Sequence, residues 1–163
     1  MATIFRRLPV PKTLATEFLG VFSRFEYALK AAGFVRGDHK RVEADWDTFA
    51  RQIAPKFKRT RNPQLDVAVK YLLTQPPRRQ VIVNKRVAWR DSPPDANVSE
   101  SERVLLMVRR VRNNLFHGAK YWSPENGRRA RDRLLVAHSL TVLKVCVSLN
   151  EEVTIMYEHG AFF

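Results

Sequence analysis

The fold is decided by residues 99–118, which read SESERVLLMVRRVRNNLFHG. Ser99 followed by Glu102 three residues later forms a capping box, a start signal of an α-helix. Apolar residues then recur at helical spacing on one stripe, and Gly118 marks the stop. The stripe consists of Val104, Val108, Val111 and Leu115. The stretch is therefore predicted to be an amphipathic helix that buries one face in a helical core.

The same periodicity recurs along the rest of the chain and predicts four further helices. They span Thr13 to Gly33, Val42 to Phe57, Asn62 to Pro76, and Ser123 to about Glu158. The last is apolar on most of its surface, which predicts cover on more than one side, by the bundle centre or by a second subunit. We therefore predict an all-α bundle of four or five helices in a single domain covering residues 1–163.

Residues 78–97 interrupt this helical pattern. Val81–Val83 and Val87–Trp89 are apolar enough for two short strands around Asn84-Lys85, but Pro93-Pro94 and the nearby charges weaken a sheet. An irregular, structured connector between two helices is the preferred interpretation.

The charge balance indicates a polyanionic partner. Lys and Arg total 29 against 16 Asp and Glu, so the net charge is +13. The sequence pI is near 10.6. Such a balance is typical of proteins that bind nucleic acid and, less often, an anionic membrane surface.

Nothing in the sequence reads as a signal peptide or a membrane span. The most apolar segment, Leu134–Leu149, is interrupted by polar residues including His138 and Lys144. The single cysteine, Cys146, excludes an internal disulfide framework and lies in an apolar stretch, where it is expected to act as a small core residue. We predict a cytoplasmic protein with no membrane partner.

The residues that carry chemistry lie on the polar side of the 99–118 helix. Arg109, Asn113 and His117 are spaced i, i+4, i+8 and line up along one face, with Arg112 on its flank. Arginine grips a phosphate bidentately, and histidine titrates near neutrality and accepts a proton from a ribose 2′-hydroxyl. Such a set suits cleavage of RNA without metal or cofactor, and the sequence contains no cluster of metal-ligating residues.

Cations and aromatic residues surround this face. From Arg103 to Arg133 the chain holds eight arginines and Lys120 against Glu125 and Asp132, more than half of the net charge. Candidate nucleic-acid contacts are Arg109, Arg110, Lys120, Tyr121, Trp122, Arg128 and Arg129, the aromatic pair by stacking on unpaired bases. Glu26, on the first predicted helix, is a candidate supporting residue, although an i, i+4 pair with Lys30 explains it as well.

At these residues the chain resembles the HEPN domain family. Arg112-Asn113, followed by His117, matches the family's R-x4-6-H motif, including the polar residue directly after the arginine. The string VRNNLFHG at 111–118 and the string FSRFEYALK at 22–30 are similar to small stand-alone bacterial members. The likeness covers most of the chain.

The resemblance implies a metal-independent endoribonuclease of toxin–antitoxin or phage-defence systems, with an antitoxin protein as a partner. It implies a homodimer whose two motifs face one cleft, with Arg112 and His117 as catalytic residues and Asn113 in support. The alternative is a non-catalytic RNA- or nucleotide-binding HEPN module that acts through a partner protein. A DNA-binding regulator is disfavoured because no helix-turn-helix signal is present.

Overall fold

Helices make up most of the described chain, which comprises residues 8–116 and 129–160 of the computed structural model. Within these residues the helices are α1 (Lys12–Ala31), α2 (Trp46–Ile53), the 3-10 turn η2 (Arg59–Arg61), α3 (Pro63–Thr74), α4 (Glu100–Phe116), α5 (Arg129–Val147) and α6 (Glu151–His159). The strands form two antiparallel hairpins, β1 (Val35–Gly37) with β2 (Val42–Ala44) and β3 (Arg79–Val83) with β4 (Arg86–Arg90). The prediction of a mainly helical fold is confirmed. The prediction of a purely helical bundle of four or five helices is wrong, because six α-helices and two small sheets are present among the described residues.

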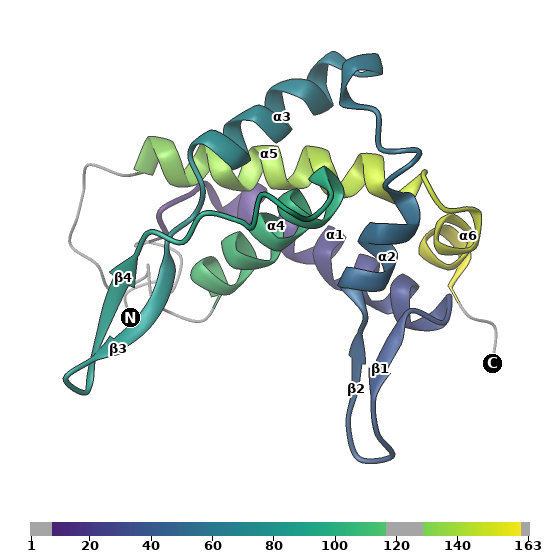
Figure 1. Cartoon of the computed structure of the whole chain (residues 1–163), viewed down its shortest axis with the longest axis horizontal. Coiled ribbons are helices and arrows are strands. Elements are labelled where there is room, and N and C mark those ends of the chain that lie inside the picture. Colours follow the sequence, from purple (N-terminus) through teal and green to yellow (C-terminus); the bar gives the residue numbers. More distant parts are fainter. Residues whose placement is uncertain (1–7, 117–128, 161–163) are drawn as a thin grey trace.

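Helix α5 crosses the middle of the molecule, with α3 on one side and α1 and α4 on the other (Figure 1). All six α-helices contribute side chains to one continuous apolar core. Its largest fully buried members are Phe18, Leu29, Phe25, Phe49, Ile53, Leu65, Leu72, Leu105, Met107, Leu115, Leu135 and Leu143. Cys146 is also fully buried, and burial raises the pKa of its thiol, so its predicted place in the core is confirmed.

Two helix starts follow the local capping signals in the sequence. At α3, the Asn62 side chain accepts a hydrogen bond from the Leu65 amide at 3.0 Å, and Pro63 occupies the first turn. At α4, the Glu102 carboxylate accepts from the Ser99 amide at 3.0 Å, and the Ser99 hydroxyl accepts from the Glu102 amide at 3.3 Å. Both predicted starts are confirmed, while the predicted stop of α4 at Gly118 lies outside the described residues.

Helix α1 begins slightly earlier than the sequence indicated. The carbonyl of Pro11 accepts the first helical hydrogen bond, from the amide of Ala15 at 3.0 Å, so Pro11 holds the cap position and Thr13 lies inside the helix. Gly33 follows the helix end with φ +85, a left-handed conformation that favours glycine. The predicted stop is thus confirmed and the predicted cap is wrong.

The second predicted helix, over Val42–Phe57, is wrong at both ends. Its first residues form β2 instead, paired with the unpredicted β1, and Val42 leaves 60% of its surface exposed. The Asp45 carboxylate then accepts from the Thr48 amide at 3.0 Å and from its hydroxyl at 2.8 Å, which starts α2. These hydrogen bonds also lower the pKa of Asp45.

The predicted irregular connector at 78–97 contains the β3–β4 hairpin. Asn84 and Lys85 form its two-residue turn with φ of 50 and 61, and Val83 faces Arg86 across it. Positive φ at both central positions matches the right-handed twist of the flanking strands, which outweighs the charges that disfavoured a sheet. The two short strands that the sequence allowed are the correct interpretation.

The long final helix predicted to run to about Glu158 is broken. Helix α5 ends at Val147, and the Asn150 side chain caps α6 by accepting from the Val153 amide at 2.9 Å. The two helices meet at 110°, because this cap starts a new helix in another direction. The predicted start, Ser123 to Glu125, lies outside the described residues. Within the described residues, no single helix is long and apolar enough to span a membrane. Helices α5 and α6 meet that criterion only when they are counted together, across the bend between them.

Candidate nucleic-acid interface

The polar face of α4 opens into a cavity of about 460 Å³ between α4, α1 and the β1–β2 hairpin. Arg109 and Asn113, one helical turn apart, both line it, and Arg112 joins them from the flank. Arg109 and Asn113 thus share one face of α4, while His117, the third residue of the predicted row, lies outside the described residues. Among the described lining residues, cations outnumber carboxylates: Lys30, Arg36, Arg41, Arg109 and Arg112 face Glu26 and Glu43.

Arg112 is held in place by contacts on two sides. Its guanidinium lies 5.4 Å from the centre of the Phe22 ring, a cation–π contact between α4 and α1. Its Nη1 donates to the Asn113 Oδ1 at 3.1 Å. Asn113 thus orients the neighbouring arginine.

Aromatic rings form one wall of this cavity and anchor Glu26. Trp46 stacks on Phe22 with ring centres 5.2 Å apart and on Phe25 at 5.1 Å. The Trp46 indole nitrogen donates to the Glu26 carboxylate at 3.3 Å. Glu26, from the first predicted helix, therefore lies in the same cavity as Arg112 and Asn113.

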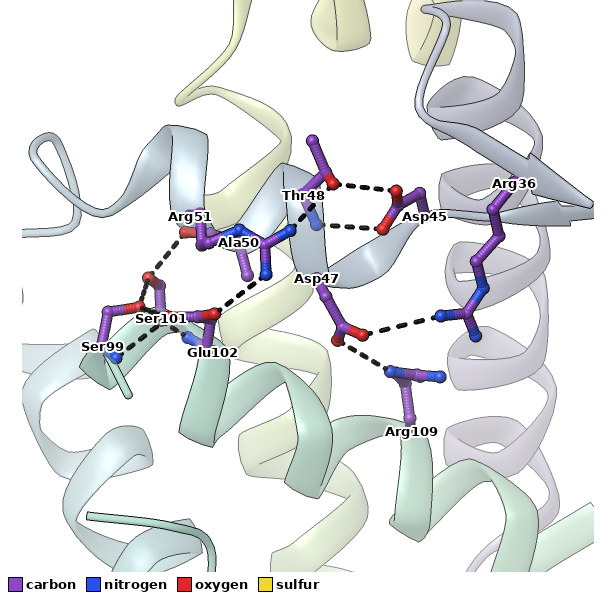
Figure 2. Close-up of polar contacts among 10 residues, drawn as sticks. All are labelled: Arg36, Asp45, Asp47, Thr48, Ala50, Arg51, Ser99, Ser101, Glu102 and Arg109. Carbon is purple, nitrogen blue, oxygen red and sulfur yellow. Dashed lines mark hydrogen bonds and ion pairs between the residues drawn. The ribbon is translucent and has the colours of Figure 1, made fainter. Parts of the chain in front are cut away.

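Asp47 joins the cations of two elements at the rim of the cavity. Figure 2 shows its carboxylate between Arg109 of α4, at 3.3 Å, and Arg36 of β1, at 3.6 Å. Glu43 of β2 pairs with Arg36 at 3.4 Å and also with Arg41. These pairs are largely exposed, so each contributes little stability. The two Asp47 pairs link the hairpin to α4, and all four pairs partly neutralise the cations.

The start of α4 is tied to α2, which sets the position of the cavity wall. The Ser101 hydroxyl donates to the Ala50 carbonyl at 2.8 Å, and Arg51 pairs with Glu102 at 3.4 Å (Figure 2). Hydrogen bonds from Ser99, together with Arg51, hold the pKa of Glu102 below its usual value. These contacts favour the ionised Glu102 carboxylate, which pairs with Arg51 and accepts the Ser99 hydrogen bonds.

Arg110, predicted beside Arg109 as a nucleic-acid contact, lies on a different side of α4. It lines a second cavity of about 560 Å³ beside the β3–β4 hairpin. Its guanidinium donates to the backbone carbonyl of Ser92 and to its hydroxyl at 3.3 Å. Burial and the nearby charge of Arg79 lower the pKa of Arg110. Asn113 lines both cavities, so the two meet at this residue.

The remaining predicted site residues fall outside what the structure describes. Helix α5 begins at Arg129, whose backbone alone is described. The others lie in the segment 117–128 and are His117, Lys120, Tyr121, Trp122 and Arg128. Within the described residues, no group of three or more His, Cys, Asp or Glu side chains is placed to hold a metal ion.

His138 occupies a half-buried place between two helices. Its ring contacts that of Tyr71 on α3, with centres 4.7 Å apart, and burial lowers its pKa. His138 thus packs between α5 and α3 and lies outside the two cavities beside α4.

Sequence reasoning missed the β1–β2 side of the first cavity. Arg36 and Arg41 flank a Gly-Asp turn signal at 37–38, in a stretch reading VRGDHKRV from 35 to 42. A glycine and an aspartate between two short β-type segments indicate a hairpin, and the four cationic or titratable residues around them indicate a basic one. This basic hairpin pattern at 35–42 would have identified the β1–β2 side of the first cavity.

No protein-family model, curated protein or solved structure matches this chain.

Proposed function

We propose that this chain is a metal-independent endoribonuclease that holds the RNA backbone against the polar face of α4. The observation that carries the proposal is the cavity in which Arg109, Arg112 and Asn113 lie with the cations of α1 and the β1–β2 hairpin. Guanidinium groups bind phosphates through paired hydrogen bonds, and Arg112 is already oriented by Phe22 and Asn113.

The chemistry of this proposal uses the R-x4-6-H motif that the chain shares with HEPN domains. His117 removes the proton of a ribose 2′-hydroxyl, and the 2′-oxygen attacks the adjacent phosphorus. The bond from phosphorus to the 5′-oxygen breaks, and a second, protonated His117 from a partner copy donates its proton to that oxygen. Arg112 stabilises the negative charge on the phosphorane. The products are a 2′,3′-cyclic phosphate and a 5′-hydroxyl.

A homodimer is part of this proposal, because in-line attack places the 2′-oxygen and the leaving 5′-oxygen on opposite sides of the phosphorus, so one histidine does not reach both. The resemblance to HEPN domains supports it, whereas the apolar surface of α5 is already covered by α1, α3 and α4 within one chain. Light scattering at micromolar concentration tests it directly, and a monomer would remove the second proton donor from the mechanism.

The enzyme proposal is tested by incubating purified protein with a mixed RNA pool in EDTA. Wild type is compared with Arg112→Ala, His117→Ala and the matched control Arg61→Ala, an exposed cation in η2. Cleavage by wild type and the control alone, with cyclic-phosphate ends, is expected. Melting curves of all four proteins separate loss of catalysis from loss of folding.

A second candidate function is RNA or nucleotide binding without cleavage. The size of the first cavity favours it, since about 460 Å³ is typical of small-molecule sites, and its cations suit the phosphates of a nucleotide. Tight nucleotide or RNA binding with no cleavage by wild type would favour this function over the nuclease.

A further inference from the structure

The β3–β4 hairpin is fastened to α4 at both of its ends. Asn114 of α4, nearly buried, donates to the carbonyl of Arg78 at 2.8 Å, just before β3. Arg110 of α4 donates to the carbonyl and hydroxyl of Ser92, just after β4. Arg78 and Asp91 pair across the base at 2.9 Å. The base of the hairpin is thus held firmly against the helix that carries the proposed active site.

Three arginines lie near this base, two on the hairpin and one on α4. Arg79 and Arg90 are directly opposite each other in the sheet, so their side chains leave the same face. Like charges in such a pair repel, and no carboxylate within the described part of the chain forms an ion pair with either of them. Arg110 lies close enough for the charge of Arg79 to lower its pKa. An anion bound between these guanidinium groups would relieve the repulsion.

The cavity beside the hairpin offers hydrogen-bond donors for such an anion. Its volume is about 560 Å³, and its polar lining comes from Arg79, Gln80, Arg110, Asn113 and Asn114. Guanidinium groups donate only, and amide groups donate through nitrogen, so the site is suited to phosphate oxygens. The sequence predicts a nucleic-acid contact for Arg110. It does not predict any such role for the β3–β4 hairpin, which completes this site.

The two cavities meet at α4. Asn113 lines both, and the two hairpins project from the same side of the helical body with α4 between them (Figure 1). A strand that fills the first cavity therefore reaches the second by crossing α4 at Asn113. Its phosphates would contact cations on both sides of the helix.

We propose that the β3–β4 hairpin is a second RNA-binding element, in which Arg79, Arg90 and Arg110 bind phosphates that flank those held in the first cavity. The proposal rests on the proposed function for the identity of the ligand as RNA, but it does not require cleavage. The hairpin tip exposes Ile82 at 81% and Val87 at 67%, which is also a feature of membrane-inserting loops. RNA is the favoured ligand because Arg79 and Arg110 line the cavity that continues the first one, and Arg90 lies opposite Arg79 at the base of the hairpin.

The test compares a short and a long 5′-fluorescein oligouridylate, of about 4 and 16 nucleotides, by fluorescence anisotropy. Both carry 2′-O-methyl groups, so the proposed nuclease cannot cleave them during the titration. The variant is Arg79→Gln/Arg90→Gln, which leaves Arg110 and its hairpin contacts in place. The matched control is Lys58→Gln/Arg61→Gln, which removes the same charge beyond the far end of α3, a 12-residue helix about 18 Å long. Titrations between about 50 and 200 mM KCl give the salt dependence of binding.

The hairpin variant is expected to bind the long oligonucleotide about 10-fold more weakly. Its salt slope should fall by about 0.7 for each phosphate that the protein no longer neutralises, hence by about 1.4 for two. The short oligonucleotide, which fits the first cavity alone, and the control variant should both stay within about 2-fold of wild type. A long oligonucleotide carrying a terminal 4-thiouridine should also crosslink to residues 79–90.

Other outcomes would overturn the proposal in recognisable ways. Equal losses for the short and long oligonucleotides, or an unchanged salt slope, would refute the flanking site while leaving the nuclease proposal in place. The expected binding pattern without any RNA cleavage would support the hairpin site and refute the nuclease. Absence of RNA binding by wild type would refute both. A last outcome concerns membranes. If wild type sediments with vesicles containing phosphatidylserine, and the hairpin variant does not but binds RNA as wild type does, the hairpin binds a membrane surface instead.

Discussion

Replacing Asp47 by asparagine should tighten RNA binding, because this carboxylate competes with phosphate for the cations of the first cavity. It lies 3.3 Å from Arg109 and 3.6 Å from Arg36. A phosphate on the opposite edge of the Arg109 guanidinium would stand about 6 to 7 Å from the Asp47 charge, where two like charges repel by about 0.6 kcal/mol in water. Asp47 is half-exposed, so the water value applies and salt reduces it further.

The expected gain is therefore about 3-fold in affinity at low salt, since about 1.4 kcal/mol corresponds to 10-fold. The salt dependence should become steeper. Thermal stability should change little, because exposed ion pairs contribute at most about 1 kcal/mol. The assay is anisotropy of a fluorescein-labelled 2′-O-methyl oligouridylate, which lacks the attacking hydroxyl, with wild type and Asp47→Asn at two or more salt concentrations.

Asp66→Asn is the matched control, because Asp66 also lies between two cations, Arg59 at 2.9 Å and Lys70 at 2.6 Å, but on α3. It removes the same charge away from both cavities and should leave RNA affinity near that of wild type. Unchanged or weaker binding by Asp47→Asn would refute the idea that Arg109 contacts the phosphate backbone. An equal gain in both variants would show that only the net charge of the protein matters.

Three further predictions concern stability. Phe25→Ala removes a fully buried ring packed on Trp46 and Phe49, and urea unfolding should show a loss of about 3 to 5 kcal/mol; a loss near zero would contradict the assigned core. Ser99→Ala breaks the capping box of α4 and should lower the melting temperature by about 2 to 4 °C, for a loss of about 1 kcal/mol. The pKa of His138 is lowered by burial, so the unfolded state binds more protons below about pH 6.5 and stability falls as pH drops. Between pH 8 and 5, the melting temperature of His138→Gln should therefore decrease less than that of wild type. An equal decrease in the two proteins would contradict this prediction.

The sequence predicts those elements whose signals are local. The starts of α3 and α4 depend on one side chain and an amide three residues away, so Asn62 and Ser99 identify them without tertiary information. The hairpins depend on pairing between very short strands, and three or five residues carry too little periodicity to distinguish a strand from a helix. The α5–α6 break escapes detection because apolar residues continue through Val153, while the bend is set by the Asn150 cap.

The candidate site divides in the same way. Arg109 and Asn113 share a cavity because helical spacing places i and i+4 on one face. Arg110 follows Arg109 in the sequence, so its side chain leaves the helix in a different direction and lines the second cavity. The cations of the β1–β2 hairpin reach α4 only through tertiary folding, so no spacing rule connects Arg36 with Arg109 across the intervening α2.

The contact of α1 with α6 has a consequence for the order of folding. Arg24 of α1 donates to the backbone carbonyls of Tyr157 and, at 2.9 Å, Glu158, which follow it by more than 130 residues. Closing a loop of that length costs chain entropy before any contact compensates for it, which slows folding. The α1–α6 pairing should therefore form late, after α3, α4 and α5 have associated. Hydrogen exchange during refolding would show it as protection of the α6 amides that lags behind protection in α3.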